Sequence, residues 1–170
     1  MQALGVKLLQ LQHDRLFARP CLIQCFAVGD AQSLALGLET ADLVHEVFAH
    51  ASDATDASRE LGERMTKELR EVERIAMKLA SAERLAYGGI DPSPAPLGAR
   101  AIRAALEALS GVPFGDSGTL RACALVTEVL KKLDVKQCGY AGLMLPVLED
   151  AVLALARDAV RQFPDNAIEL

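Results

Sequence analysis

The most regular pattern of apolar and polar residues lies between Ser58 and Leu85. Apolar side chains recur there every three or four positions, which predicts one long helix with a single buried face. Most of the other positions are charged, as on the exposed side of such a helix. A coiled-coil partner would also suit this stripe, but its length of about four turns favours packing on the chain's own domain. The predicted buried face comprises Leu61, Met65, Leu69, Val72, Ile75, Ala76 and Leu79.

Short apolar runs bounded by turn residues predict strands on both sides of this helix. Cys21–Val28 is one such run, and Ser33–Leu38 is the next. A helix from Glu39 to about Ala51 follows the second strand. A third short strand ends at Asp91, because the alternating prolines of residues 92–96 exclude both a helix and a strand ladder.

Two more helices are predicted in the second half of the chain. Residues 99–109 form one, which Gly111 ends. Thr119–Leu133 forms the other, and it is apolar on most of its circumference, so we expect neighbours to cover more than one of its sides. Strands that alternate with helices are typical of α/β proteins. The predicted fold is therefore α/β: a helix-rich partial barrel or open sheet, with short strands each followed by a helix.

Composition narrows the classes of function. The chain has 170 residues, the length of a single domain spanning residues 1–170. Apolar residues make up 51% and charged residues 24%, which is typical of a soluble globular protein. A net charge of −5 and an aromatic content of 4% argue against a nucleic-acid surface. No apolar run is long enough to cross a bilayer, which argues against a membrane protein.

The cysteines and histidines do not stand at metal-ligand spacing. There is no CxxC pair, and the histidines complete no ligand set, so no metal site is predicted. Free thiols indicate a reducing compartment, and we expect the protein to be cytoplasmic. A catalytic cysteine and, for the basic segment Met1–Arg19, a transit peptide stay open as alternatives. The cysteines and histidines of the chain are Cys21, Cys25, Cys123, Cys138, His13, His45 and His50.

Polar side chains at the predicted strand ends are the candidates for chemistry. Glu39 stands where a strand passes into a helix, and Asp91 and Ser93 follow the third strand. Glu149 lies in the opening turn of a later helix. Because α/β folds bind ligands at the carboxyl ends of their strands, Glu39, Asp91 and Glu149 are candidate catalytic residues and Ser93 a candidate ligand-binding residue. The structural alternative is that acids near a helix start are stabilised by the helix dipole alone.

A glycine-rich turn precedes the helix at Thr119. Its residues Gly115, Ser117, Gly118 and Thr119 are candidate ligand-binding residues, because backbone amides at a helix start attract anions. The turn has neither the lysine of a P-loop nor the spacing of a dinucleotide-binding motif, and an ordinary helix cap would need the same residues. A second turn, Gly139–Gly142, precedes Pro146, which suits the first position of a helix.

Four runs of residues carry a resemblance to a known family. They are Leu34–Glu39 with Ala41–Val44, Tyr87–Asp91 with Ser93, Ala95 and Pro96, Pro113–Gly115 with Gly118–Leu120, and Gly139–Tyr140 with Gly142–Asp150. In order and spacing these runs resemble the domain of unknown function 711 family. The similarity covers about residues 33–160, which form the family-like region, and leaves residues 1–32 as a divergent N-terminal segment.

The resemblance implies an α/β barrel of the pyruvate formate-lyase-like type and no established activity. Members of that family are much longer, so this chain resembles an internal fragment of one. No glycyl-radical motif is present, and radical chemistry is therefore not implied.

Three hypotheses follow. The strand ends bind a small polar or anionic metabolite or a metal, with or without catalysis. Alternatively, the chain is a non-catalytic truncated module that acts through self-association as a homo-oligomer or through a protein partner, because an interrupted barrel exposes strand edges. The third is a shortened product with no role of its own. The sequence names no substrate, cofactor or reaction. The first hypothesis requires that Leu38, Ile90 and Leu143 lie on one sheet.

Overall fold

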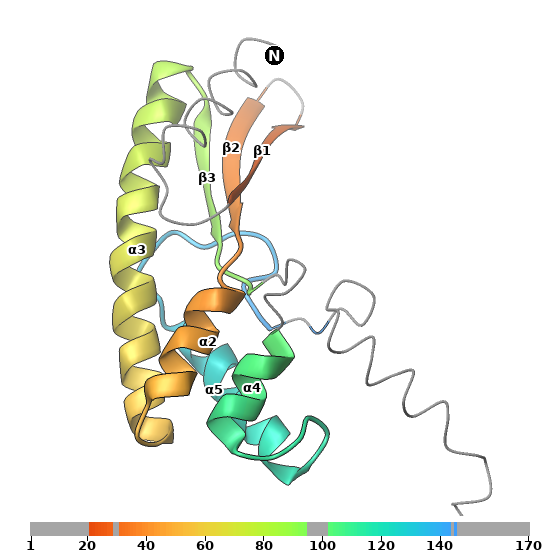
Figure 1. Ribbon diagram of the computed structural model, residues 1–170. Coiled ribbons are helices and arrows are strands. Elements are labelled where there is room, and N and C mark those ends of the chain that lie inside the picture. Colours follow the sequence, from red (N-terminus) through yellow and green to blue (C-terminus); the bar gives the residue numbers. More distant parts are fainter. Residues whose placement is uncertain (1–20, 29–30, 95–101, 144, 146–170) are drawn as a thin grey trace, which may run out of the picture.

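The computed structural model describes residues 21–28, 31–94, 102–143 and 145. Three strands form one sheet, in the order β1-β2-β3, and helices pack along one side and at one end of it (Figure 1). The strands are β1 (Cys21–Val28), β2 (Ala31–Leu38) and β3 (Ala86–Asp91). The helices are α2 (Ala41–His50), α3 (Ala54–Ala82), α4 (Ile102–Ser110) and α5 (Ser117–Lys131).

The sheet combines two kinds of strand pairing. β1 and β2 are antiparallel, with Cys21 opposite Leu38. β2 and β3 are parallel, with Gly37 opposite Asp91, and the chain between them passes through α2 and α3. The prediction of a mixed α/β fold is thus confirmed. The prediction that a helix follows each strand is wrong for β1, because only two residues separate it from β2 and a parallel crossover needs a dozen or more.

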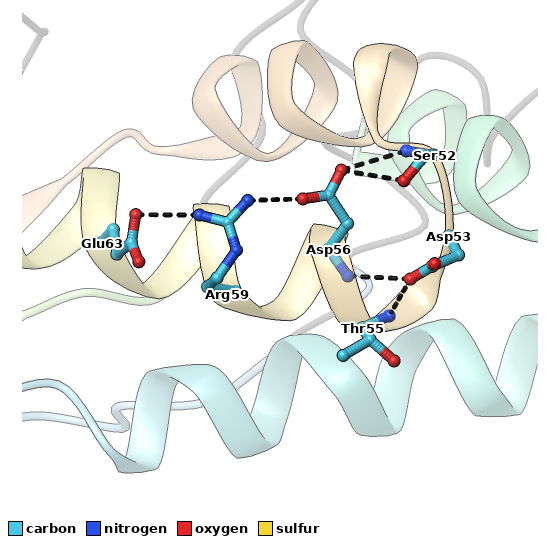
Figure 2. A network of polar contacts seen from close by, with 6 residues as sticks. All are labelled: Ser52, Asp53, Thr55, Asp56, Arg59 and Glu63. Carbon is cyan, nitrogen blue, oxygen red and sulfur yellow. Dashed lines mark hydrogen bonds and ion pairs between the residues drawn. The ribbon is translucent and has the colours of Figure 1, made fainter.

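The long helix begins earlier in the chain than its apolar pattern indicated. Asp53 precedes α3, and its Oδ1 atom accepts hydrogen bonds from the amides of Thr55 and Asp56 at 2.8 and 2.9 Å (Figure 2). The Asp56 carboxylate contacts Ser52 and, on its other side, Arg59. The predicted start at Ser58 was therefore one turn late, because an N-terminal cap extends a helix beyond its buried stripe.

The core lies between the sheet and the helices. The side chains that alternate along β2 at Leu34, Leu36 and Leu38 are buried, as is Ile90 of β3. The predicted face of α3 is confirmed, since Leu61, Met65, Leu69, Val72 and Ala76 are buried and Ile75 and Leu79 are partly buried. α3 runs beside β3 and continues past the sheet to α2 and α5 (Figure 1). One helix thus joins the sheet to the helical end of the molecule.

α5 is covered by two neighbours, as its composition predicted. It packs against α3 and α4 and buries Ala122, Val126, Val129 and Leu130. Leu120, at the start of α5, remains 79% exposed, so the coverage is incomplete there. In the part of the chain that the structure describes, no helix combines the length and hydropathy needed to span a membrane. The barrel, in contrast to the α/β class, remains a prediction.

Candidate functional site

The carboxyl ends of β2 and β3 lie side by side. Their parallel register places Gly37 opposite Asp91, at the end of both strands. Just beyond the strands, the buried Thr40 side chain donates a hydrogen bond to the Pro92 carbonyl oxygen at 3.3 Å. The structure therefore brings two of the predicted strand-end groups, those at Glu39 and at Asp91 with Ser93, to the same edge of the sheet.

A third segment, residues 136–142, runs along the free side of β3. The Ile90 amide donates to the Lys136 carbonyl at 2.8 Å, and the Cys138 amide donates to the Ile90 carbonyl at 2.9 Å. These bonds form a parallel bridge between Ile90 and Gln137. Gly89, with φ of 128°, makes this approach possible, because a Cβ atom there would lie 2.7 Å from the Lys136 carbonyl oxygen.

Lys136 fixes the start of this segment to two other elements. Its Nζ atom donates to the Tyr87 carbonyl oxygen at 2.5 Å and lies 5.6 Å from the centre of the Tyr87 ring. Its amide donates to the Glu73 carboxylate of α3 at 2.9 Å. Burial, together with the negative charge of Glu73, raises the pKa of Tyr87 well above its usual range, so the phenol stays protonated. The segment is thus held by both β3 and α3.

The Asp91 carboxylate is surrounded by hydrogen-bond donors. Its Oδ1 atom accepts from the Ser93 hydroxyl at 2.5 Å, the Ser93 amide at 3.0 Å and the Ala141 amide at 3.1 Å. Its Oδ2 atom accepts from the Tyr140 amide at 3.0 Å. Gly139, with φ of 68°, lies against the carboxylate so closely that a Cβ atom there would collide with it. The Asp91 carboxylate therefore occupies a position at which three backbone amides, those of Ser93, Tyr140 and Ala141, could otherwise bind an anion.

Ser93 links Asp91 to Gly142, at the end of the segment of residues 136–142. Its hydroxyl donates to Asp91 and accepts a hydrogen bond from the Gly142 amide at 3.2 Å, and its side chain is only 7% exposed. We call Asp91, Ser93 and the backbone of residues 139–142 the strand-end cluster. Its bonds from the amides of residues 140–142 tie that loop to Asp91 and Ser93 at the end of β3, which is the pattern of a structural anchor.

The ionisation of Asp91 agrees with that role. Burial acts to raise its pKa, but the hydrogen bonds from Ser93, Tyr140 and Ala141 outweigh burial and hold the pKa below its usual value. A carboxylate of low pKa that already accepts four hydrogen bonds is a weak general base at neutral pH. The catalytic role predicted for Asp91 therefore has less support than a positioning role.

Cys138, beside Asp91, and Cys123 of α5 remain protonated thiols. Burial raises the pKa of Cys138, and the negative charge of Asp91 raises it further. Burial also raises the pKa of Cys123, and both thiols are free. The thiolate is the nucleophilic form, so neither environment favours a catalytic cysteine. The side chains of Cys21 and Cys25 lie outside the described part of the structure.

Glu39 differs from Asp91 in having an unsatisfied oxygen. Its Oε2 atom is buried and has no hydrogen-bond partner among the described atoms. It directly follows β2 and precedes Thr40, whose hydroxyl joins the two strand ends. A buried carboxylate oxygen without a partner is costly, so it marks a position where a donor from a ligand would be stabilising.

The first glycine turn lies at the other end of α5. Its donors act within the turn, since the Gly115 amide donates to the Thr119 hydroxyl at 2.9 Å. Gly118 packs against Ser110, and a Cβ atom on Gly118 would lie only 3.0 Å from the Ser110 Cβ atom. Ser117 starts α5 and is exposed. A helix rises 1.5 Å per residue, so Ser117 lies about 20 Å from the other end of α5. The structure thus does not bring this turn to the strand ends.

Glu149 and its neighbour Asp150 lie outside the described residues, as does the helix predicted from Pro146. Leu38 and Ile90 share the sheet as expected, while Leu143 follows the strand-end cluster and belongs to no described strand. Within the described ranges, no three His, Cys, Asp or Glu side chains are grouped closely enough to hold a metal ion.

The sequence predicted the acidic residues Glu39 and Asp91 of the site but not the groups that form hydrogen bonds there. It did not predict the bond from Thr40 to Pro92 or the amides of residues 140–142 around Asp91 and Ser93. The signal was present in two glycine pairs, Gly88–Gly89 and Gly139 with Gly142, because glycines allow backbones to come close. Nothing in the sequence indicated that Gly89 faces residues 136–138 or that Gly139 faces Asp91.

Fold and site together define an α/β protein in which parallel strand ends and a glycine-rich loop form one polar cluster. The chain belongs to the family described as Uncharacterised ACR (DUF711), whose model matches residues 22–162. No curated protein and no solved structure is matched by this chain.

Proposed function

We propose that the protein binds a small polar metabolite at the ends of β2 and β3, with Glu39 as the ligand-binding carboxylate. The observation that carries this proposal is the buried Glu39 Oε2 atom, to which no described group donates a hydrogen bond. The neighbouring strand ends support it, because open α/β sheets bind ligands beyond the carboxyl ends of their parallel strands.

The hydrogen-bonding state of the cluster favours a ligand that donates. The amides of Tyr140 and Ala141 already bind Asp91, and that of Gly142 binds Ser93, so these donors are not free for an anionic group. Glu39 offers an acceptor with negative charge. A hydroxyl or ammonium group would satisfy it, so a polar ligand with such a group suits the site better than an anion.

Asp91 and Ser93 act in this proposal as positioning residues. They hold residues 139–142 against β3 and thereby keep the strand ends in place beside Glu39. The proposal assigns binding only; a reaction would require a second functional group, and Glu149 remains the candidate from the sequence.

A binding screen on the purified full chain tests the proposal. Ethanolamine, glycerol and acetate serve as probes for an ammonium group, hydroxyl groups and a carboxylate, and amide NMR shifts of residues near Thr40 report binding. Glu39→Gln is expected to weaken binding of the amine about tenfold, the effect of losing one charged hydrogen bond. Glu128→Gln, which removes an exposed carboxylate on α5, is the matched control and should have no effect. Equal binding by Glu39→Gln and the parent protein would refute the role of Glu39.

The wider architecture belongs to the same proposal. We propose that the described sheet is part of an α/β barrel of the pyruvate formate-lyase-like type, of which this chain is an internal fragment. The parallel bridge between Ile90 and Gln137 supports it, because it adds a further parallel segment beside β3. Free Cys123 and Cys138 support a reducing, cytoplasmic location. An experimental structure in which residues 137–143 turn away from the sheet would contradict the barrel.

Self-association is the second candidate function. β1 pairs with β2 on one side, and no other described strand pairs with its opposite side. An unpaired strand edge is a template for a strand of another chain. Light scattering after size exclusion measures the mass in solution, and a compact monomer over a wide concentration range would exclude this candidate.

A further inference from the structure

We propose that a groove between α3 and α5 is a second binding site, for a small organic anion with more than one phosphate or carboxylate group. The groove has a volume of about 660 Å³, within the usual range for small-molecule sites. Its lining residues are Ser58, Arg59, Gly62, Glu63, Thr66, Lys67, Arg70, Val129, Lys132 and Leu133.

The apolar part of the groove follows from the close approach of the two helices. Gly62 has no side chain, and a Cβ atom there would lie only 3.8 Å from the Val129 Cγ1 atom. Val129 and Leu133 are 5% and 6% exposed. Apolar contacts of this kind suit the carbon skeleton of an organic ligand.

The charge of the lining contrasts with that of the whole protein. Four of the lining residues are cationic and only Glu63 is acidic, whereas the chain carries a net charge of −5. Lys67 and Arg70 are three residues apart on α3 and therefore lie on one face of that helix. Lys132 approaches from the end of α5. The concentration of positive charge at a hollow on an acidic protein indicates an anionic ligand.

Arg59 is held by Asp56 and Glu63, but Arg70 and Lys132 are available because their present ion pairs are exposed. Arg70 pairs with Asp134, and Lys132 lies 3.7 Å from Glu128, with side chains that are 58% to 82% exposed in these pairs. Exposed ion pairs contribute little and exchange readily with an anion from solution. Lys67 makes no ion pair with any residue in the described ranges.

The negative end of α5 does not oppose an anion strongly. The carbonyl oxygens of Leu130 and Leu133 both accept hydrogen bonds from the Gln137 side-chain amide, at 2.8 and 3.2 Å. The bond to Leu130 satisfies one of the last carbonyls of α5, which would otherwise carry the negative partial charge of the helix end, and Leu133 lies just beyond the helix. No residue of the groove belongs to the strand-end cluster, so this proposal stands or falls independently of the proposed function.

Calorimetric titration of the full chain with inorganic pyrophosphate and with citrate, at low ionic strength, tests the proposal. Removing one charge about 6 Å from a single negative charge in water changes the affinity about threefold, and each probe carries more than one negative charge. The double variant Lys67→Gln, Lys132→Gln is therefore expected to bind more weakly by about tenfold or more. Glu63→Gln, which removes the acidic group, should bind more tightly by about threefold or more.

A control variant separates a site from the general attraction of charge. Lys78→Gln with Arg121→Gln makes the same change in net charge at exposed positions outside the groove. It should bind the two anions as the parent protein does, to within about twofold. Equal weakening in both double variants, or no binding of either anion by the parent protein, would overturn the proposal.

Discussion

Replacement of Asp91 is the sharpest test of the strand-end cluster. The Oδ1 atom accepts three hydrogen bonds and the Oδ2 atom one. Asparagine can keep the three bonds to one oxygen, but its amide group would face the Tyr140 amide, so two donors would oppose each other. Alanine leaves all four donors without this partner.

The hydrogen bonds set the magnitude. A hydrogen bond to a charged group contributes about 1.5–3 kcal/mol, and a neutral one about 1 kcal/mol. Asp91→Asn loses the bond from the Tyr140 amide, and its other three hydrogen bonds become bonds to a neutral group. The partial exposure of the site reduces the resulting loss of stability. We expect a loss of about 2–3 kcal/mol in the free energy of unfolding for Asp91→Asn and about 3–5 kcal/mol for Asp91→Ala.

Urea denaturation followed by circular dichroism measures both losses. Asp134→Ala is the control, because this carboxylate is 82% exposed and its ion pair is with exposed Arg70, so a change below about 0.5 kcal/mol is expected. Added formate should raise the melting temperature of Asp91→Ala but not of the parent protein, since the small carboxylate can occupy the vacated position. Losses below about 0.5 kcal/mol for both Asp91 variants would refute the anchoring role.

The stability due to Asp91 should also depend on pH in a defined direction. Its pKa is lower in the folded protein than in the unfolded chain, so folding favours the ionised form. The contribution is therefore complete above the unfolded pKa of about 4 and is lost as the pH falls through the folded pKa. Between pH 7 and 3 the stability difference between the parent and Asp91→Asn should narrow only at the acidic end. A constant difference would contradict this.

Three further substitutions have predicted signs, each measured as a change in unfolding free energy. Gly62→Ala should stabilise α3 by about 0.5–1 kcal/mol, because the new methyl group meets only Val129 at an ordinary contact distance of 3.8 Å; a destabilised variant would show that the two helices cannot accommodate it. Gly139→Ala should cost about 2 kcal/mol or more, because φ is 68° and the methyl group would collide with Asp91; an unchanged stability would mean that the loop is not held there. Asp53→Ala should cost about 1 kcal/mol through loss of the cap of α3, and Asp53→Asn, which retains a capping oxygen, should cost less.

The elements that local patterns specify could be predicted from the sequence. β1 coincides with its predicted range, and the buried face of α3 follows from the spacing of its apolar residues. The start of α3 was missed because Asp53 caps the helix eight positions before Leu61, the first apolar residue of the predicted stripe. The direction of pairing between β1 and β2 was not apparent either, since periodicity specifies a strand but not its partner.

The site shows the same division between local and long-range information. Glu39, Asp91 and Ser93 could be chosen as candidates because each follows a predicted strand. Their different roles could not be predicted. The bonds that distinguish Asp91 and Ser93 come from residues 49 or 50 positions away, while Glu39 has a buried oxygen that accepts no hydrogen bond from the described residues. Spacing in the sequence carries no information about such contacts.

The arrangement of β3 has a consequence for the order of events during synthesis. Ile90 and Asp91 contact β2, which is made before them, and residues 136–142, which are made after them. While the nascent chain ends before Lys136, β3 lacks the neighbour that residues 136–142 provide, and Asp91 accepts from Ser93 but not yet from Tyr140 and Ala141. The strand ends can therefore close late, after the helices α2 to α5 have been synthesised, and a translational pause before Lys136 would leave that edge of the sheet open to chaperones.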